Sequence, residues 1–179
     1  LFDDESDNPS AVTRDYTLVL QDADNIPCVS VYGGKITTYR RLAESVLDKL
    51  APWTKTRRGP WSKDEALPGG KFKRADRAQE LDYLKKKYAR LDAHFLTRLF
   101  GRHGRLAHVI LKEAQTPAEL GRDFGGGLVQ REVDYLITHE WACQPDDILW
   151  RRTKCGLHMS EQQRAEFAAW FNERCPRRS

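Results

Sequence analysis

The amino-acid sequence predicts a mainly α-helical protein, in which a small strand–strand–helix piece is followed by an all-α domain. Only two runs of residues typical of β-strands occur, and both lie within the first 32 residues. Beyond residue 60 the apolar residues recur every three or four positions, which is the spacing of amphipathic helices. We therefore expect the strands near the start of the chain and the remaining mass in helices.

A stretch rich in proline, glycine and tryptophan, residues 52–73, shows little periodicity and separates the two parts. We place residues 1–55 in the first domain and residues 56–179 in the second. With 179 residues, 40% of them apolar, the chain is long enough for one ordinary core and a smaller appended piece. It is too short for a complete two-domain cofactor enzyme and starts at Leu1, so we expect it to be cut from a larger protein.

Composition also bears on location and partners. No apolar run approaches the roughly 20 residues that cross a bilayer. The four cysteines include no Cys-x-x-Cys pair, which favours free thiols in a reducing compartment and hence the cytoplasm. Up to Pro52 there are 5 Lys and Arg against 9 Asp and Glu, a charge of −4, which leaves 25 against 17, or +8, for the remainder. Because the cations alternate with acids, a solvated helical surface is favoured over a surface for nucleic acid or anionic lipid.

The first strand is predicted over residues 13–20, where Tyr16, Leu18 and Leu20 alternate with polar side chains. Turn-forming residues 22–25 end it.

A second β-rich run, residues 26–32, stops at Gly33 and Gly34. Thr37 is then placed to cap a helix that runs to about Leu50. The apolar residues of this helix fall on one face and are Leu42, Val46, Leu47 and Leu50.

The second part is predicted to contain about six short helices. Four apolar stripes mark the first four: Leu81, Leu84, Tyr88 and Leu91; Phe95, Leu96, Leu99 and Phe100; Leu106, Val109 and Ile110; and Val129, Val133, Leu136, Ile137 and Trp141. The loop of residues 125–127, all glycine, leads into the fourth helix. Asp146 is placed to cap a fifth helix that carries Trp150, and Ser160 with Gln163 resembles a capping box that opens the sixth.

The stretch Ser30–Arg40 combines a strand, two glycines, a lysine and the start of a helix. A helix N-terminus presents unpaired N–H groups and the positive end of the helix dipole, so it stabilises an anionic group. Glycines allow the backbone to approach a ligand without a Cβ atom in between. On these grounds the ligand is a phosphate, a carboxylate or a flavin, and the alternative is a glycine turn before a core helix.

Four spaced segments carry a resemblance to a known family: Thr13–Tyr16, Ser30–Arg40, Leu67–Gly70 and Asp146–Lys154. In this order they resemble the C-terminal third of the aerobic, flavin-dependent glycerol-3-phosphate dehydrogenases. The likeness extends over nearly the whole chain. It implies that the strand–strand–helix piece is the last part of an FAD-binding α/β domain and that the all-α domain packs outside it.

The resemblance implies roles for six residues. The cofactor-binding residues would be Gly33, Gly34, Lys35, Ile36 and Thr37, which would line the pyrimidine edge of FAD. Arg14 would hold the phosphate of the substrate with its planar set of donors, and Lys35 would add a positive charge to the same pocket. An ion pair of Arg14 with the neighbouring Asp15 is the alternative.

The resemblance further implies an enzyme that oxidises sn-glycerol 3-phosphate to dihydroxyacetone phosphate and passes electrons to quinone. No complete set of catalytic residues is present, so the chain is expected to need the N-terminal FAD-binding part of the polypeptide and to be inactive alone. A peripheral position at the inner face of the cell membrane, contact with anionic lipid and a homo-oligomer are also expected. Two alternatives stay open: a glycerol-3-phosphate oxidase of the same superfamily, and a non-enzymatic basic helical module that binds a partner.

Other candidate sites are weak. The residues from His139 to Cys143 lack the second histidine of a zinc-protease helix, and the acidic residues 3–7 lack the spacing of a calcium loop, so no metal site is expected. The best basic patch consists of Arg151, Arg152, Lys154, Arg174, Arg177 and Arg178. Nucleic acid is not expected to bind it, because Trp150 and Trp170 fit inward helical faces and leave no aromatic side chain for base stacking.

Overall fold

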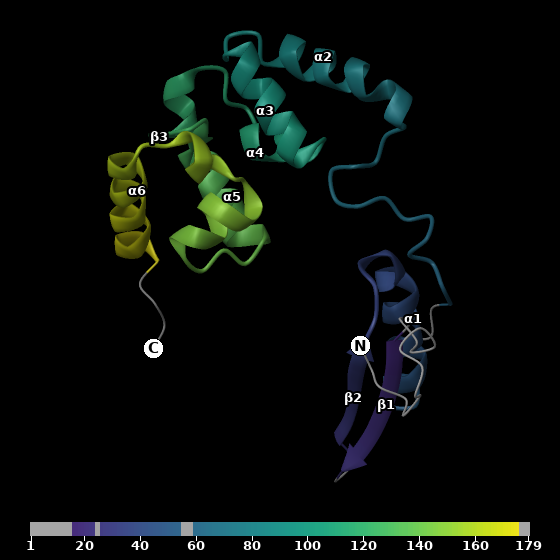
Figure 1. Cartoon of the computed structure of the whole chain (residues 1–179). Helices are drawn as coiled ribbons and strands as arrows, with labels where there is room; N and C mark the ends of the chain where they lie inside the picture. The colour runs from purple at the N-terminus through teal and green to yellow at the C-terminus, as the bar shows by residue number, and fades with distance from the viewer. Residues whose placement is uncertain (1–15, 24–25, 55–58, 176–179) are drawn as a thin grey trace, which may run out of the picture. The chain divides into compact units, whose positions relative to one another are not determined.

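The computed structural model describes residues 16–23, 26–54 and 59–175, and it divides the chain into two units, Leu1–Glu65 and Ala66–Ser179 (Figure 1). Each unit is described by itself below. The predicted boundary between residues 55 and 56 stays a prediction, whereas the mainly α-helical fold class is confirmed.

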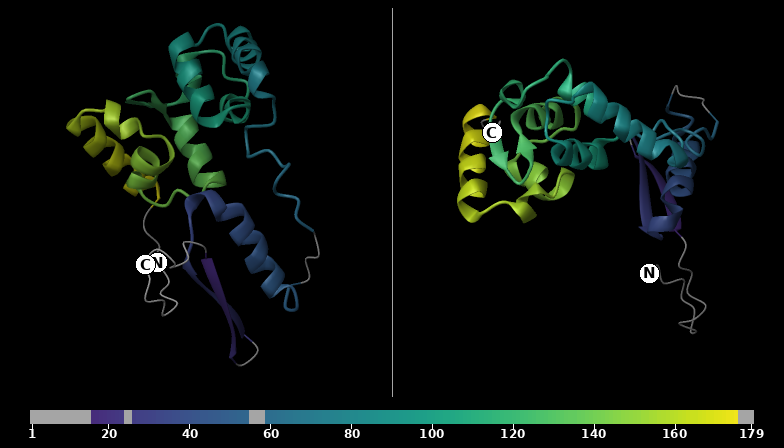
Figure 2. Two further views of the ribbon diagram at one scale, coloured as in Figure 1. Left: turned by 45° about the vertical axis from the view of Figure 1, so that its right-hand side comes forward. Right: turned by 90° about the horizontal axis from the view of Figure 1, so that it is seen from above.

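The first unit is a β-hairpin followed by one helix (Figure 2). Strands β1 (Tyr16–Ala23) and β2 (Ile26–Gly33) pair antiparallel, with Tyr16 opposite Gly33. A 3-10 turn (Ile36–Thr38) then leads into helix α1 (Tyr39–Leu50). The Tyr16 hydroxyl lies 3.0 Å from Ser45 Oγ, which links the hairpin to the helix.

The described part of the first unit contains no buried side chain. Leu47 was expected on an inward helical face, yet it is 59% exposed, and Val31 of strand β2 is also exposed. Three elements cannot enclose an apolar face between them, because a sheet or helix stripe needs a second layer to cover it. The described part of the first unit therefore leaves its apolar side chains without a covering layer.

The second unit is built from helices joined by short turns. Its helices are α2 (Arg77–Lys87), α3 (Ala93–His103), α4 (Leu106–Leu111), α5 (Gln130–His139) and α6 (Glu161–Arg174), with a π-helical segment at Asp147–Arg152. Single 3-10 turns lie at Arg74–Asp76, Pro117–Leu120 and Cys155–His158. The helix count predicted from the apolar stripes agrees with this arrangement.

A second small hairpin corrects the prediction that this domain is entirely helical. Strands β3 (Asp123–Gly125) and β4 (Leu128–Val129) pair antiparallel before α5 begins. The last residue of β3 and the turn after it are glycines with positive φ, 87° at Gly125, 59° at Gly126 and 75° at Gly127, a conformation that suits glycine. Val129, expected as the first apolar residue of the helix, is buried as part of β4 instead.

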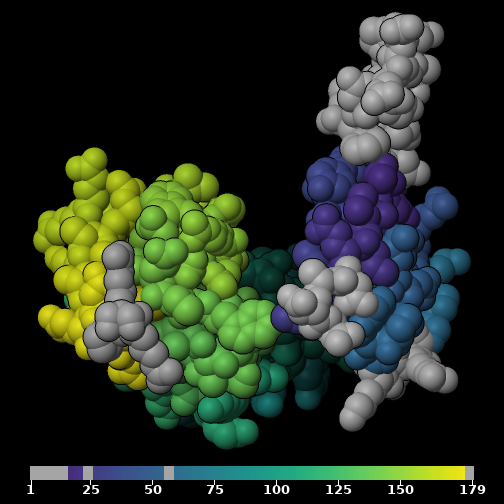
Figure 3. Space-filling view, turned by 90° about the horizontal axis from the view of Figure 1, so that it is seen from below, coloured from purple at the N-terminus to yellow at the C-terminus, as the bar shows by residue number. Residues whose placement is uncertain are grey.

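Two clusters of buried side chains hold the second unit together, and its side chains fill a continuous body (teal to yellow in Figure 3). The first cluster joins α2, α3 and α4 through residues such as Leu84, Leu99 and Leu111. The second joins α5, the π-helical segment and α6 through residues such as Leu136 and Phe167. The capping box predicted at the start of α6 is confirmed, since Gln163 N donates to Ser160 Oγ at 3.1 Å and Ser160 N to Gln163 Oε1 at 2.9 Å.

A fully buried carboxylate, Glu132 of α5, connects the helices. Arg102 of α3 donates from Nε and Nη2 to its two oxygens, both at 2.7 Å, and His103 Nε2 lies 2.7 Å from Oε1. Arg102 also donates to Gly127 O at 3.2 Å. Burial alone would raise the pKa of Glu132, but the hydrogen bond from His103 and the Arg102 guanidinium outweigh it and hold the pKa below its ordinary value.

We predict that Glu132→Gln destabilises the chain by about 3 kcal/mol, because the buried Arg102 guanidinium loses its counter-charge. Urea unfolding followed by circular dichroism measures this change. The matched control is Glu166→Gln, which removes an exposed carboxylate 3.7 Å from Arg122 and should leave the unfolding midpoint unchanged. Equal effects of the two substitutions would contradict a structural role for the buried network.

The same network predicts that the unfolding free energy of the chain falls at acidic pH. A carboxyl whose folded-state pKa is lowered contributes stability above its ordinary pKa of 4.5 and loses that contribution as the pH falls through the lowered value. The unfolding free energy of Glu132→Gln should therefore fall less steeply below pH 4.5 than that of the unsubstituted chain.

Candidate functional site

The candidate site is the turn between strand β2 and helix α1. Gly33 and Gly34 both have positive φ, 75° and 104°. A Cβ atom added at Gly34 would meet Tyr16 Cβ at 3.7 Å, which is ordinary contact, so the backbone conformation and not lack of space requires glycine there. Lys35 returns to extended backbone at φ −121° and ψ 146° before the 3-10 turn starts.

Thr38, and not Thr37, closes the start of this helix. Thr38 N donates to Lys35 O at 3.0 Å, and the Thr38 hydroxyl donates to the same oxygen at 2.9 Å. The prediction that Thr37 caps the helix is wrong, because the helix opens with a 3-10 turn at Ile36, so that Thr37 lies inside the turn. The spacing of a 3-10 turn places the third residue, Thr38, back over Lys35.

The turn is open to solvent and flanked by apolar side chains. Residues 33–37 are all exposed, with Ile36 at 89%, and Tyr39 at the start of α1 is 67% exposed. The first N–H groups of a helix have no partner within it, so this surface combines backbone donors with apolar contact area. A planar ring system with a polar edge fits such a surface, and the residues at positions 33 to 37 are compatible with a flavin.

Arg14 and Asp15 lie outside the described residues, so the predicted contact of Arg14 with a substrate phosphate stays a prediction. The roles of Gly33, Gly34, Lys35, Ile36 and Thr37 as cofactor ligands also stay predictions. The structure does bring the last five together as one continuous turn at the head of one helix.

The Leu67–Gly70 segment has a structural role in the second unit. Gly69 has φ 81°, and a Cβ atom added to it would lie 2.1 Å from His103 O. Gly104 has φ 54°, and its added Cβ would lie 2.3 Å from Gly69 O. Arg105 N donates to Gly69 O at 2.9 Å. The backbones at Gly69 and Gly104 thus touch at the junction of α3 and α4. This contact explains why both positions are glycine, and no ligand is needed to explain them.

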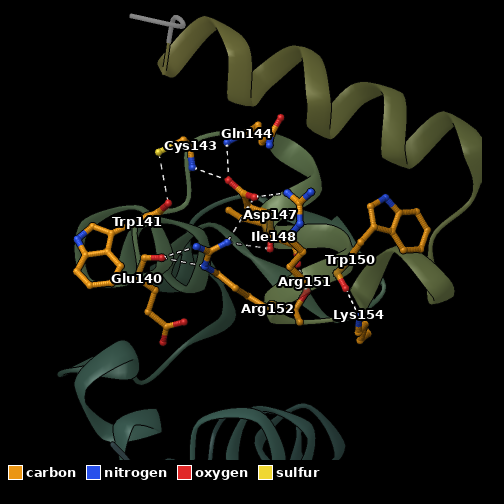
Figure 4. A network of polar contacts seen from close by, with 11 residues as sticks. Glu140, Trp141, Cys143, Gln144, Asp147, Ile148, Trp150, Arg151, Arg152 and Lys154 are labelled. Atoms are coloured by element: carbon orange, nitrogen blue, oxygen red, sulfur yellow. Dashed lines mark hydrogen bonds and ion pairs between the residues drawn. The ribbon is translucent and has the colours of Figure 1, made fainter. Parts of the chain in front are cut away.

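The Asp146–Lys154 segment is also structural (Figure 4). The Asp147 carboxylate accepts hydrogen bonds from Cys143 N at 2.9 Å and Gln144 N at 3.1 Å, and Arg151 Nη1 donates to it at 2.5 Å. Burial raises the pKa of Asp147, but the Cys143 N–H and the Arg151 guanidinium outweigh burial, so the pKa is lowered. Asp146 was predicted to cap this segment; its side chain makes no capping bond, and the neighbouring Asp147 binds the preceding loop instead.

Arg152 closes the other end of the same loop. Its Nε and Nη2 donate to Glu140 O at 2.9 and 2.6 Å, just past the end of α5 (Figure 4). Trp141, predicted to face inward, is 84% exposed with φ 54°, because the helical period does not continue beyond His139. The indole points away from the network in Figure 4.

Most side chains of the predicted basic patch form hydrogen bonds or ion pairs within the second unit. Arg151 and Arg152 bind Asp147 and Glu140 O, Lys154 Nζ donates to Trp150 O, and Arg174 lies 3.3 Å from Asp134. Arg177 and Arg178 lie outside the described residues. Each of these four cations thus has a polar contact inside the second unit. Within the described ranges, no helix is long and apolar enough to pass through a membrane.

Comparison with known proteins shows to which family the chain belongs. A sequence profile described as the C-terminal domain of alpha-glycerophosphate oxidase matches residues 61–170, more than half of the chain. The chain belongs to this family.

Relatives of this glycerophosphate oxidase family match both units. The aerobic glycerol-3-phosphate dehydrogenase of Escherichia coli (strain K12) is 41% identical over 179 residues, which covers 97% of this chain and 34% of the relative. The glycerol-3-phosphate dehydrogenase of Pseudomonas aeruginosa is 43% identical, covering 99% of this chain and 35% of the relative. The D-erythritol 1-phosphate dehydrogenase of Brucella abortus (strain 2308) is 42% identical over 175 residues, covering 96% and 34%. The chain thus spans about a third of the length of these relatives.

The role of Arg152 in this family member can be tested against that of its neighbour. Arg152→Lys should destabilise the chain by about 1–2 kcal/mol, because lysine cannot make the two-donor contact to Glu140 O. Arg151→Lys, at a position whose side chain is 62% exposed, should leave stability nearly unchanged. Thermal unfolding of both variants gives the comparison, and a larger loss at Arg151 would refute the assignment.

Proposed function

We propose that the chain forms the C-terminal part of an FAD-dependent glycerol-3-phosphate dehydrogenase. The whole polypeptide oxidises sn-glycerol 3-phosphate to dihydroxyacetone phosphate and passes the electrons to quinone. It works at the cytoplasmic face of the cell membrane as a peripheral protein, in contact with anionic lipid and as a homo-oligomer. The N-terminal part supplies the rest of the FAD site, so the chain alone carries no flavin and is inactive.

The observation that carries this proposal is the exposed turn at the head of α1. A helix N-terminus beside exposed apolar side chains, at Ile36 and Tyr39, suits a ring system that is apolar over its faces and accepts hydrogen bonds at one edge. Gly34 has no side chain to obstruct that edge, and its φ of 104° favours glycine at this position.

Each residue of the turn has a task in this proposal. FAD, when bound, supplies the acceptor for the hydride that leaves C2 of the substrate. The N–H groups of Ile36 and Thr37 would hold the pyrimidine edge of the flavin and would stabilise negative charge there, because backbone donors at a helix start are fixed in place. Lys35 adds a full positive charge, and together with Arg14 it binds the substrate phosphate.

The absence of buried side chains from the described part of the first unit supports the incomplete nature of the site. A hairpin whose apolar side chains stay exposed requires neighbouring strands to form a stable layer. The chain matches 34% and 35% of the length of two relatives, and the remainder of each relative can provide such neighbouring strands.

The names of the relatives and of the matched profile suggest an alternative substrate and an alternative electron acceptor. A relative called D-erythritol 1-phosphate dehydrogenase is as similar to the chain as those called glycerol-3-phosphate dehydrogenase, at 42% against 41% and 43% identity. The matched profile carries the name of an oxidase. We favour glycerol 3-phosphate and quinone because most of the similar relatives bear the name glycerol-3-phosphate dehydrogenase.

The test is a chimera in which the chain replaces the matching third of the E. coli relative. It should bind FAD and oxidise glycerol 3-phosphate in preference to D-erythritol 1-phosphate, and reduce a quinone analogue faster than oxygen. Lys35→Met should lower kcat/KM for glycerol 3-phosphate about 10- to 100-fold, because a charged donor to the substrate is lost.

The control is Lys49→Met, which removes an exposed lysine from the opposite end of α1 and should leave kcat/KM unchanged. Flavin content is measured in both variants, so that loss of cofactor is separated from loss of substrate binding. A flavin-loaded chimera whose activity is indifferent to Lys35→Met would overturn the assignment of that residue.

A further inference from the structure

A polar hollow of about 300 Å³ lies between the end of α4 and one face of α5, wholly within the second unit. Helix α5 contributes side chains spaced by three or four residues, so that they share a face: Arg131, Asp134, Tyr135, Thr138 and His139. Lys112, just past the end of α4, completes the wall, and the apolar side chains of Val109 and Ile110 form one side. The opposite face of α5 carries the buried residues Val133 and Leu136.

The cations of this hollow are Lys112 and Arg131, and the charge of Arg131 also acts on the Glu119 carboxylate. Among the described residues, neither Lys112 nor Arg131 forms an ion pair with a carboxylate. The one carboxylate in the wall, Asp134, lies 3.3 Å from Arg174 Nη2, and the charge of Glu140 acts on Tyr135 from nearby. The lining itself carries two cations and one carboxylate, and this balance favours an anionic ligand.

Protein donors occupy three carbonyl oxygens at or just past the end of α4, which lowers their repulsion of an anion. Arg131 Nη1 donates to Leu111 O, Tyr88 donates its hydroxyl hydrogen to Lys112 O at 2.8 Å, and Lys112 N donates to His108 O at 2.9 Å. A guanidinium has five N–H donors, so Arg131 retains four after its bond to Leu111 O.

Lys112 occupies a position where glycine is the usual residue. Its φ is 50°, in the left-handed region, directly after the last residue of α4. A side chain in this conformation costs about 1 kcal/mol relative to glycine. Attraction to the helix dipole is a weak reason to keep lysine there, because α4 has only 6 residues.

Tyr135 supplies a neutral donor. Its ring lies between those of His103 and His139, with centroid distances of 6.0 and 4.8 Å. Burial, and then the charge of Glu140, raise the pKa of Tyr135, so the hydroxyl stays protonated. The Thr138 hydroxyl donates to Asp134 O at 2.8 Å and is left as an acceptor for a ligand hydroxyl.

We propose that this hollow binds the phosphate of a small phosphate monoester, with Lys112 and Arg131 as charged ligands and Tyr135 as a neutral donor. Arginine and lysine are the side chains that bind phosphate best, the former through its fork of donors and the latter as a point charge. The short carbon chain of the ligand lies against Val109 and Ile110. The site is independent of the flavin proposal, because every residue in it belongs to the second unit.

The test titrates the purified chain with inorganic phosphate and with sn-glycerol 3-phosphate by calorimetry and by amide NMR. Saturable binding that weakens with added sodium chloride is expected, with shifts at the amides of residues 112, 131 and 135. Lys112→Gly removes the cation and relieves the left-handed backbone together, so the variant should be at least as stable as the unsubstituted chain and bind phosphate about tenfold more weakly.

Lys154→Gly is the matched control. Lys154 is a second exposed lysine in the left-handed region, with φ 61°, and it lies outside the hollow. Its removal should leave phosphate affinity unchanged, whereas Tyr135→Phe should weaken it without loss of stability. An affinity that is equal in Lys112→Gly and Lys154→Gly, or no saturable phosphate binding at all, overturns the proposal.

Sedimentation with vesicles that contain phosphatidic acid distinguishes a free metabolite from a lipid headgroup, because both carry a phosphate monoester. Retention of the unsubstituted chain but not of Lys112→Gly would assign the phosphate to lipid. Tight binding of soluble glycerol 3-phosphate with no retention on vesicles would assign it to a metabolite. Retention unaffected by Lys112→Gly, together with unaffected phosphate titrations, counts against the site.

Discussion

The stability of each unit depends on whether its apolar side chains are covered by a second layer of structure. Hairpin β1–β2 and helix α1 present apolar side chains that the described part of their own unit leaves exposed or half-buried. The helical unit, in contrast, buries two clusters of side chains and a complete charge network around Glu132. The described part of the first unit thus lacks a covered apolar core, whereas the second unit has cores of its own. The candidate flavin turn lies in the first unit.

The segments that carry the family resemblance divide into two kinds. Leu67–Gly70 and Asp146–Lys154 are explained by contacts inside the helical unit, namely the approach of Gly69 to Gly104 and the binding of the loop ends by Asp147 and Arg152. The glycine–lysine turn has no comparable internal explanation, because its residues are exposed. Contacts within the fold therefore account for the first kind, and the turn is the segment to which we assign a function in the proposal above.

Periodicity in the sequence predicted the helices and most of their inward faces, because burial of an apolar stripe is what makes these helices stable. It failed where the local rule was not periodic. The strands of hairpin β3–β4 are too short to show alternation, and a run of three glycines before a helix is also typical of a loop. Trp141 continues the apolar spacing of α5 although the helix has already ended, and so it was placed inward.

The site was predictable only in part. The glycine pair, the lysine and the helix start are local features, and the structure places them in one turn. The choice of Thr38 over Thr37 depended on a 3-10 turn that composition does not reveal. The hollow beside α5 was not anticipated, although Arg131, Tyr135 and His139 recur every four residues, because Lys112 joins them only through packing of α4 against α5.

The proposed contact joins the helix headed by Lys35 to the pyrimidine edge of a flavin. A crystal structure of the chain joined to the N-terminal part of the E. coli relative that it does not match, with FAD bound, tests this contact most directly. Backbone nitrogens of residues 35–37 are expected within hydrogen-bonding distance, about 3.5 Å or less, of the flavin pyrimidine oxygens or ring nitrogens. A turn that faces solvent, with the flavin edge bound by other residues, would contradict it.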